Sequence, residues 1–139
     1  MVMKRHVAIL VRDKDNRILF VRRSMKKKTL PGAWSFPSGT VEDGEDIFMT
    51  AIREAKEELG IRVSVEKLMA TKKLPEFSVC LYFILCVTRD GIPFIQEPNE
   101  IDELSWMTMS NFFKKFSDDE IGHGLIWLRQ NPNIWDMIV

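Results

Sequence analysis

The chain has 139 residues, of which 45% are hydrophobic, and its 20 basic residues balance its 20 acidic ones. This length and composition predict one domain, residues 1–139, with a core of its own, and they exclude a disordered chain. The neutral balance argues against a dedicated nucleic-acid binder, because such proteins usually carry a basic excess.

The cysteines and the apolar runs bear on where the protein works. Cys80 and Cys86 lie in one apolar run, and on a single strand they would be roughly 20 Å apart at about 3.3 Å per residue, too far for a disulfide. Two unpaired thiols indicate a reducing compartment. The N-terminal residues contain no cleavage site of a leader, and no apolar run reaches the length of a membrane span. We therefore expect a cytoplasmic protein with no membrane partner.

The first part of the chain predicts a hairpin, a loop and a helix. Apolar runs at residues 7–11 and 18–21 predict two strands around a turn at residues 13–16. A loop with several glycines and prolines follows, and a short strand is expected inside it at residues 34–36. An acidic turn then leads into a helix over residues 46–59, which Gly60 ends as its C-cap.

The second part predicts three more strands, at residues 63–71, 79–88 and 104–107. The strand at residues 79–88 contains VCLYFILCV and is apolar almost throughout, which predicts a central strand covered on both faces. The C-terminal residues are amphipathic and predict two helical pieces. Strands interspersed with helices are typical of an α/β domain with a layered core.

The predicted helix carries a concentration of carboxylates. At about 100° per residue, Glu54, Glu57 and Glu58 share an arc of about 100° beside an apolar face. That face is expected to comprise Phe48, Ala51, Ile52, Ala55 and Leu59. Like charges this close repel, so the segment REAKEELG is either an ordinary solvated helix face or a set of ligands for a cation.

A glycine upstream of the helix favours the second interpretation. Gly39 allows the backbone to turn tightly and to expose a carbonyl oxygen. Carboxylates together with a carbonyl are the hard oxygen donors that Mg²⁺ or Mn²⁺ prefers.

The spacing of these residues resembles the Nudix box of the Nudix hydrolases. The box is Gly, five residues, Glu, seven residues, Arg-Glu, an apolar residue, any residue, Glu-Glu, any residue, Gly and an apolar residue. The segment GTVEDGEDIFMTAIREAKEELGI, residues 39–61, matches every fixed position with Gly39, Glu45, Arg53, Glu54, Glu57, Glu58 and Gly60. The apolar positions hold Ala55 and Ile61. Many relatives have two glycines where this chain has Ser38 and Gly39.

The resemblance implies a fold and a reaction. The fold is an α/β/α sandwich around a central mixed sheet, with the box forming a loop–helix–loop. The reaction is Mg²⁺- or Mn²⁺-dependent attack of water on a pyrophosphate bond in a nucleoside diphosphate joined to another group. A diphosphate is anionic, so divalent ions between it and the glutamates would neutralise charge and activate water.

The resemblance also implies a role for each box residue. Metal ligands are expected at Gly39, Glu54, Glu57 and Glu58, with Gly39 giving its carbonyl oxygen. Glu54 is alternatively the base that activates water. Arg53 would orient the glutamates by charge-assisted hydrogen bonds, and Glu45 would hold the box loop behind them.

Residues outside the box carry further expectations. Some relatives use an acid from a later loop as ligand or base, and the candidates in order of preference are Glu100, Glu97 and Glu103. The lysines at residues 26–28 are expected to be solvated, and His6 and His123 to be structural.

Two pairs are candidates to bind substrate. Arg22 and Arg23 resemble a pair of arginines that contacts substrate phosphate in relatives acting on nucleoside triphosphates, with a solvated strand end as the alternative. Trp34 and Phe36 flank the box loop and are candidates to contact a base or sugar, with core packing as the alternative.

Three functions remain open at this point. The first is hydrolysis of a nucleoside triphosphate, oxidised ones included, to monophosphate and pyrophosphate. The second is hydrolysis of ADP-ribose or another sugar nucleotide, whose enzymes often carry a proline near the position of Pro75. The third is a non-catalytic Nudix-fold domain that senses a nucleotide, which the complete carboxylate set disfavours. In each case we expect a small-molecule nucleotide partner, no nucleic acid, and a monomer or homodimer.

Overall fold

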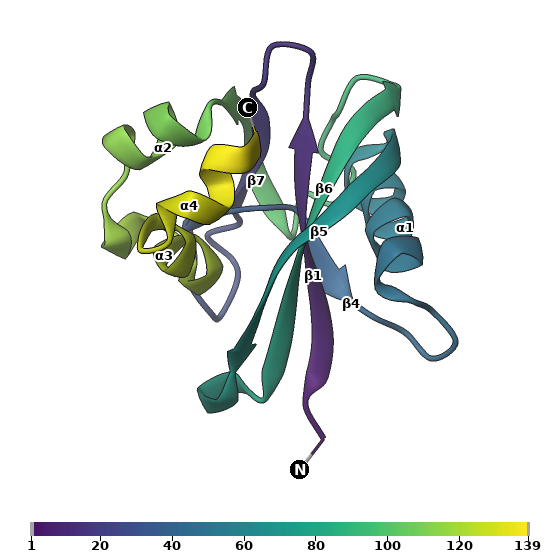
Figure 1. Cartoon of the computed structure of the whole chain (residues 1–139), viewed down its shortest axis with the longest axis horizontal. Coiled ribbons are helices and arrows are strands. Elements are labelled where there is room, and N and C mark those ends of the chain that lie inside the picture. Colours follow the sequence, from purple (N-terminus) through teal and green to yellow (C-terminus); the bar gives the residue numbers. More distant parts are fainter. Residues whose placement is uncertain (1, 139) are drawn as a thin grey trace.

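A seven-stranded mixed sheet forms the centre of the computed structural model, which describes residues 2–138 (Figure 1). Its strands are β1 (Lys4–Arg12), β2 (Ile18–Arg23), β3 (Trp34–Ser35), β4 (Ser38–Thr40), β5 (Arg62–Leu74), β6 (Val79–Asp90) and β7 (Ile101–Met107). The order is β3-β2-β1-β6-β5, and β4 pairs with β1 while β7 pairs with β2. The β1–β6 pair is parallel and the other strand pairs are antiparallel.

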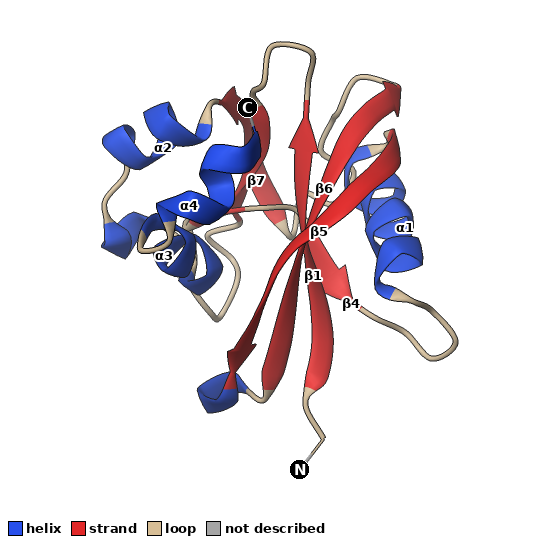
Figure 2. Cartoon of the chain, viewed as in Figure 1, coloured by secondary structure: helices blue, strands red, loops and turns tan. Residues whose placement is uncertain are grey.

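Helices cover both faces of this sheet (Figure 2). The α-helices are α1 (Ile47–Leu59), α2 (Met109–Lys115), α3 (His123–Arg129) and α4 (Pro132–Trp135). Short 3₁₀ turns are η1 (Pro75–Phe77), η2 (Asp118–Glu120) and η3 (Asp136–Ile138). Helix α1 lies on one side of the sheet, and the C-terminal helices α2, α3 and α4 lie on the other. The expected α/β/α sandwich is confirmed.

The alternation of side chains along the strands divides the core into two clusters. In β1, Val7 and Ile9 belong to the cluster beneath α1, whereas Ala8 and Leu10 belong to the cluster beneath α2–α4. Stacked rings of Phe20 and Phe112, with centroids 3.9 Å apart, lie in the second cluster. Strand β6 is buried from both sides, which confirms the prediction of a central apolar strand.

Local signals fix both ends of α1. The side chain of Asp46 accepts a hydrogen bond from the backbone N–H of Met49 (2.8 Å), which caps the N-terminus. Gly60 has φ 66° and ends the helix in the left-handed region, where glycine is favoured. The predicted start and stop of the helix are therefore confirmed.

The buried stripe of α1 differs from the expected one. Ala51, Ala55 and Leu59 are buried as predicted, but Phe48 and Ile52 are exposed, and Thr50 is buried instead. The buried arc is thus centred nearer to the glutamates than the hydrophobic pattern indicated. The C-terminal prediction was also too simple, because the expected two helical pieces are three α-helices and two 3₁₀ turns within the described residues.

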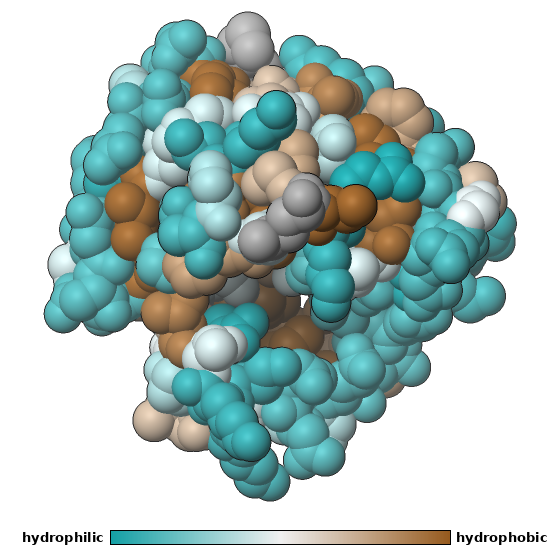
Figure 3. Space-filling view, turned by 90° about the horizontal axis from the view of Figure 1, so that it is seen from below, coloured by the Kyte–Doolittle hydropathy of each residue, from teal (hydrophilic) through white to brown (hydrophobic). Residues whose placement is uncertain are grey.

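The structure also bears on two further expectations, one about the cysteines and one about membrane spans. Cys80 and Cys86 are both free and buried. Within residues 2–138, none of the helices is long and apolar enough to cross a bilayer. Seen from below, the surface is largely hydrophilic, with apolar side chains gathered in and beside a central hollow (Figure 3).

The corrected stripe predicts different outcomes for two neighbouring substitutions. Ala51→Lys places a charge where the parent side chain is 0% exposed and should lower the free energy of unfolding by at least about 3 kcal/mol. Ile52→Lys, at a position 45% exposed, should change it by no more than about 0.5 kcal/mol. Urea denaturation followed by circular dichroism measures both. Equal destabilisation of the two variants would contradict this orientation of α1.

Candidate active site

An acidic cavity of about 470 Å³ opens where α1, the segment before it and the segment before β7 meet. Its acidic lining residues are Glu42, Glu54, Glu57, Glu58, Glu97 and Glu100. Three cationic side chains, those of Arg23, Lys27 and Arg53, line the same cavity. The structure therefore brings most of the predicted site residues together in one place, which we call the acidic cavity.

Arg53 lies at the centre of the carboxylates. Its Nε and Nη2 donate to the two oxygens of Glu45 at 2.7 and 3.0 Å, and its Nη1 donates to Glu54 at 2.9 Å and to Glu57 at 3.0 Å. Nη2 also donates to the backbone oxygen of Thr40 at 3.1 Å. One guanidinium thus fixes three carboxylates and the β4 backbone relative to each other.

Glu45 connects the box loop to the helix. Besides Arg53, its carboxylate accepts hydrogen bonds from the Thr50 hydroxyl (2.9 Å) and the Glu42 backbone N–H (3.1 Å). The hydrogen bonds from Arg53 are the largest cause that lowers the pKa of Glu45 to about 2. Glu45 lies outside the cavity lining, at the position expected for a residue that holds the loop.

The side chain of Glu54 approaches Gly39 closely. A Cβ atom at position 39 would overlap the carboxyl group of Glu54, so any side chain there would displace it. This contact explains the glycine at position 39 by lack of space for a side chain. The expected reason was a different one, a tight backbone turn that exposes a carbonyl oxygen.

The expected role of the Gly39 carbonyl needs correction. Ile9 N–H donates to the Pro37 oxygen (2.8 Å) and Val41 N–H donates to the Arg5 oxygen (2.9 Å). In an antiparallel ladder every second pair of opposing residues is hydrogen-bonded. The pair of Gly39 with Val7 lies midway between the two pairs just named, so it is hydrogen-bonded as well, and the Gly39 carbonyl is directed at β1. The backbone groups of Ser38 and Thr40 point the other way, toward α1, which agrees with the Arg53 contact to Thr40. The carbonyl directed at the glutamates is therefore that of Ser38.

Glu58 is the most perturbed carboxyl group of the site. Its Oε2 is buried and has no hydrogen-bond partner within residues 2–138. Burial is the largest cause that raises the pKa of Glu58 to about 8, and the charges of Glu54 and Glu97 add to it against a hydrogen bond from the Ser38 backbone. Burial also raises the pKa of Glu54, against the opposing effect of Arg53.

These donors fit a divalent cation. In the described part of the chain no three acidic, imidazole or thiol groups form a complete cage, and Arg53 holds Glu54 and Glu57. A cation would therefore share these two carboxylates with Arg53. The unpartnered Oε2 of Glu58 is an oxygen donor that the protein itself leaves unused, as expected for a metal ligand.

The later acids reach the cavity because their segment is tied to the end of α1. Phe94 N–H donates to the Leu59 oxygen at 3.1 Å, and Gln96 N–H donates to the Glu58 oxygen at 3.2 Å. Residues 97 and 100 follow directly and line the cavity. Glu100 forms an ion pair with Lys27, whereas Glu97 forms none within residues 2–138.

Three predicted residues are left, Glu103, Arg22 and Arg23, and the structure brings only Arg23 to the cavity. Arg23 donates to the backbone oxygen of Thr29 (2.9 Å) and lines the cavity. Arg22 instead forms an ion pair with Glu103 at 3.2 Å, and neither belongs to the lining.

The two aromatic candidates also lie in different places, and only one of them lines the cavity. Trp34 is buried in the core beneath α2–α4, with its ring 5.4 Å from that of Phe116, and it does not line the cavity. Phe36 is buried too, but it forms part of the cavity wall. Beside it lies a second, more apolar cavity of about 140 Å³, which shares Arg23 and Phe36 with the acidic cavity and is also lined by Leu81, Phe83 and Leu125.

Two residues of the lining had been given another role from the sequence. Lys27 was expected to be solvated, yet it lines the cavity and forms an ion pair with Glu100. His6 was expected to be structural, and its Nε2 lies 3.3 Å from the Thr40 hydroxyl at the cavity edge. The run of lysines beside Arg22 and Arg23 was the one available signal for Lys27, and His6 had none.

Comparison with known proteins places this site in context. The family model of the NUDIX domain matches residues 2–126. The 8-oxo-dGTP diphosphatase of Proteus vulgaris is 34% identical over 59% of this chain and 75% of its own length. The ADP-ribose pyrophosphatase of Methanocaldococcus jannaschii is 36% identical over 46% of this chain and 37% of its own length.

Structural comparison agrees with the sequence comparison. The crystal structure of a MutT protein from Methanosarcina mazei superposes with a TM-score of 0.71 and 20% identity, covering 99% of this chain and 93% of that one, which shows a shared fold. The chain spans half or less of the length of several curated relatives, for example 50% of the peroxisomal coenzyme A diphosphatase of Caenorhabditis elegans, which is 30% identical over 78% of this chain.

The buried Glu58 predicts how the stability of the metal-free protein depends on pH. The pKa of Glu58 is about 8 in the folded chain, against an ordinary value of 4.5, so the folded state holds this proton more tightly. The resulting stabilisation is full below pH 4.5 and is lost as the pH rises through 8, on the order of a few kcal/mol. Glu58→Gln should remove most of this slope and be more stable than the parent at pH 8.

Unfolding in urea with chelator present, at a series of pH values, measures this effect. Glu45 acts in a separate window, because its pKa of about 2 adds stability that is lost only as the pH falls from 4.5 through 2. Parallel pH profiles of the parent and Glu58→Gln between pH 4.5 and 8 would contradict the assignment.

Proposed function

Because the chain belongs to the NUDIX domain family, we propose that it hydrolyses a pyrophosphate bond in a nucleotide with the help of a divalent cation, Mg²⁺ or Mn²⁺. The observation that carries this proposal is the buried, unpartnered Oε2 of Glu58 among the carboxylates that Arg53 holds. The cation would be held by Glu54, Glu57 and Glu58 and by the carbonyl of Ser38. When bound, it would neutralise phosphate charge and lower the pKa of water.

The chain's own residues supply orientation and proton transfer. Arg53 keeps Glu54 and Glu57 in place before substrate arrives, so little reorganisation is needed. Glu97, whose carboxylate forms no ion pair within residues 2–138, or the Glu54 oxygen that Arg53 does not bind would accept the proton of the attacking water. Glu100 then has the role of holding Lys27 toward the phosphates.

A nucleoside triphosphate is the substrate that the cavity supports best. Arg23 and Lys27 line the same cavity as the acidic residues and would donate to phosphates distant from the cleaved bond. The adjoining apolar cavity behind Phe36 would take the base, which leaves the phosphates in the acidic cavity. The products would be a nucleoside monophosphate and pyrophosphate.

ADP-ribose is the second candidate substrate. One relative named above acts on ADP-ribose and another on 8-oxo-dGTP, so both classes occur among proteins similar to this chain. Pro75, which suggested a sugar nucleotide, begins η1 and is not among the residues that line the acidic cavity. This position favours the triphosphate.

A non-catalytic nucleotide sensor is the alternative of another class. A pure binder has no need of a carboxyl group whose buried oxygen lacks a partner, because such a group costs about 1–3 kcal/mol of stability. Measuring the turnover of a panel of nucleotides distinguishes a sensor from a hydrolase.

Removal of the cation or of its ligands should abolish turnover. We expect no activity in excess chelator and recovery with Mg²⁺ or Mn²⁺. Glu57→Gln and Glu58→Gln should each lower kcat at least about a hundred-fold while circular dichroism stays unchanged. Release of phosphate or pyrophosphate from a panel of nucleotides is the measurement.

Glu103→Gln is the matched control, because Glu103 is an acid of β7 that lies outside the cavity. Its rate should stay near that of the parent, whereas Glu97→Gln should lower kcat. Full activity in chelator, or a Glu58→Gln enzyme as fast as the parent, would refute the proposed metal site.

The two adjacent arginines should differ in their effect on a triphosphate. Arg23→Ala removes a charged donor worth about 1.5–3 kcal/mol and should lower kcat/KM for dGTP roughly 10- to 150-fold, mainly through KM. Arg22→Ala should have little effect, because Arg22 pairs with Glu103 outside the cavity. Steady-state kinetics with dGTP, 8-oxo-dGTP and ADP-ribose provide the test.

With ADP-ribose as substrate, the terminal sugar is neutral, and the loss in Arg23→Ala should be smaller. If Arg23→Ala hydrolyses triphosphates as well as the parent does, the phosphate role is wrong and the sugar nucleotide becomes the better candidate.

A further inference from the structure

A single threonine holds the guanidinium of Arg23. Arg23 ends β2, and its Nε and Nη2 donate to the backbone oxygen of Thr29 at 3.1 and 2.9 Å. Nη2 also donates to the Thr29 hydroxyl at 3.0 Å, whereas Nη1 makes no hydrogen bond within residues 2–138. Two acceptors on one residue therefore fix the plane of the guanidinium, and the two N–H groups of Nη1 are left as donors for a ligand.

The loop that contains this threonine is anchored at its start. We call residues 24–32 the basic loop, because three of them in succession are lysines. Ser24, which is only 1% exposed, donates its backbone N–H to the Glu100 oxygen at 2.9 Å. Met25 N–H donates to the Asp102 carboxylate at 3.1 Å. The basic loop is thus tied at its start to the segment that carries the later acids.

A tight turn fixes the end of the basic loop. Ala33 N–H donates to the Leu30 oxygen at 3.2 Å, and between them Pro31 and Gly32, with φ 75° at the glycine, give the pattern of a type II turn. Leu30 itself has φ 47°, a left-handed conformation that is unfavourable for leucine and persists only where the surroundings hold it. The chain therefore turns back immediately after Thr29, in a loop that is held at both ends.

The acceptors that Thr29 offers carry no charge. Arg23 forms no ion pair within residues 2–138, so its positive charge stays available to an anion. The neighbouring Arg22 differs, because its guanidinium is paired with the Glu103 carboxylate at 3.2 Å. A carboxylate on Arg23 would compete with a phosphate for the same donors, whereas a carbonyl and a hydroxyl orient the guanidinium and leave its charge in place.

We propose that Thr29 is a positioning residue for the reaction, which holds Arg23 so that its Nη1 meets a phosphate of the substrate. This inference rests on the proposed function, in which Arg23 binds a phosphate distant from the cleaved bond. A long side chain loses rotamer freedom when it binds a ligand, and an arginine that Thr29 holds beforehand has less freedom to lose. The contribution of Thr29 is therefore expected in substrate binding.

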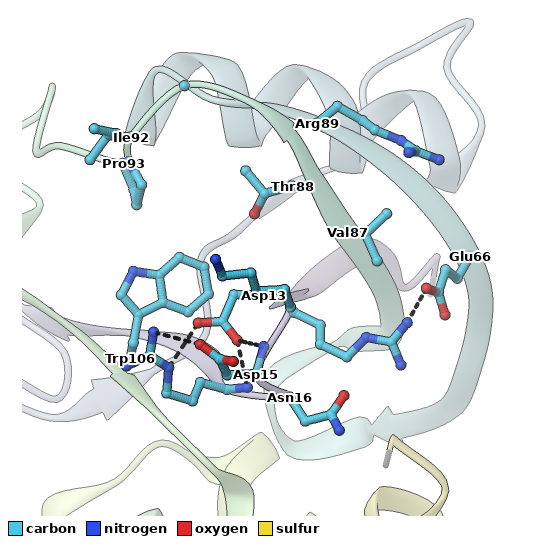
Figure 4. Close-up of a pocket in the computed structure, with 14 residues that line it drawn as sticks. Asp13, Asp15, Asn16, Glu66, Val87, Thr88, Arg89, Ile92, Pro93 and Trp106 are labelled. Carbon is cyan, nitrogen blue, oxygen red and sulfur yellow. Dashed lines mark hydrogen bonds and ion pairs between the residues drawn. The ribbon is translucent and has the colours of Figure 1, made fainter.

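An arginine elsewhere in the chain provides a matched control. Arg89 lines a larger cavity, of about 850 Å³, between the β1–β2 turn, the end of β6 and Trp106 (Figure 4). Its Nε donates to the Ser64 hydroxyl at 2.6 Å, and its side chain is directed away from Trp106. This cavity shares no lining residue with the acidic cavity. Ser64→Ala therefore removes a hydroxyl that an arginine binds, as Thr29→Val does, but outside the proposed site.

Steady-state kinetics with dGTP and Mg²⁺ test the role of Thr29. Thr29→Val keeps the shape of the side chain and the backbone oxygen but loses the hydroxyl, so KM should rise roughly 2- to 10-fold while kcat stays within about two-fold of the parent value. Thr29→Ser keeps the hydroxyl and should behave like the parent, and so should Ser64→Ala. In an Arg23→Ala background, Thr29→Val should cause no further loss, because the two residues act as a pair.

A second measurement does not depend on turnover. In ¹H–¹⁵N spectra of the full chain, the Nε–H signal of Arg23 is identified by its absence in Arg23→Lys. It should move in Thr29→Val and return to the parent position in Thr29→Ser. An unmoved signal, or a KM like that of the parent in Thr29→Val, would overturn the role of Thr29.

The double variant and the parent complete the test. If Thr29→Val raises KM as much in the Arg23→Ala background as it does in the parent, Thr29 acts without Arg23 and the inference is wrong, although the parent still hydrolyses dGTP. If the parent hydrolyses none of the nucleotides, the proposed function is wrong, and the positioning role is wrong with it.

Discussion

Carboxylates that lie close together in a folded chain repel each other unless a counter-charge lies among them or a proton neutralises one of them. In this protein that counter-charge is Arg53, which contacts Glu45, Glu54 and Glu57 at 2.7–3.0 Å. At such distances two unit charges interact by about 1 kcal/mol in water and by several kcal/mol near a protein surface. Without this guanidinium the helix would carry several mutually repelling charges, and the loop before it would lose its attachment.

The backbone around Arg53 is shaped by the same requirement. Glu54 lies so close to β4 that a side chain at position 39 would displace its carboxyl group, and Arg53 in turn binds the Thr40 oxygen of that strand. Glu58 is not bound by Arg53, and its buried Oε2 has no hydrogen-bond partner within residues 2–138. A single site thus combines carboxylates that Arg53 neutralises and holds in place with a buried carboxyl group that Arg53 does not reach.

Much of this architecture could be predicted, because it depends on signals local in sequence. Apolar runs predicted the strands, and the acidic turn and Gly60 predicted where α1 begins and ends, since helix ends depend on neighbouring residues. The carboxylates on one arc of that helix follow from its period. These elements carry the greater part of the acidic cavity.

The errors concern properties that depend on pairing between distant segments. The direction of the Gly39 carbonyl depends on which β1–β4 pairs are hydrogen-bonded, and sequence does not reveal this register. Lys27 meets Glu100 only because the segment before β7 is tied to the end of α1. Arg22 and Arg23 are instructive, because neighbouring residues of a strand point to opposite faces and one site could never have received both.

The parallel pairing of β1 with β6 has a consequence for how the chain folds. The two strands are in register from Lys4 opposite Val79 to Arg12 opposite Val87, so the middle of the sheet joins segments separated by more than half of the chain. Contacts of such long sequence separation require a large loop to close and are slow to form. During synthesis, β1 therefore waits for its central partner until β6 has been made, while α1 and the β1–β2 hairpin, whose contacts are local, can form earlier.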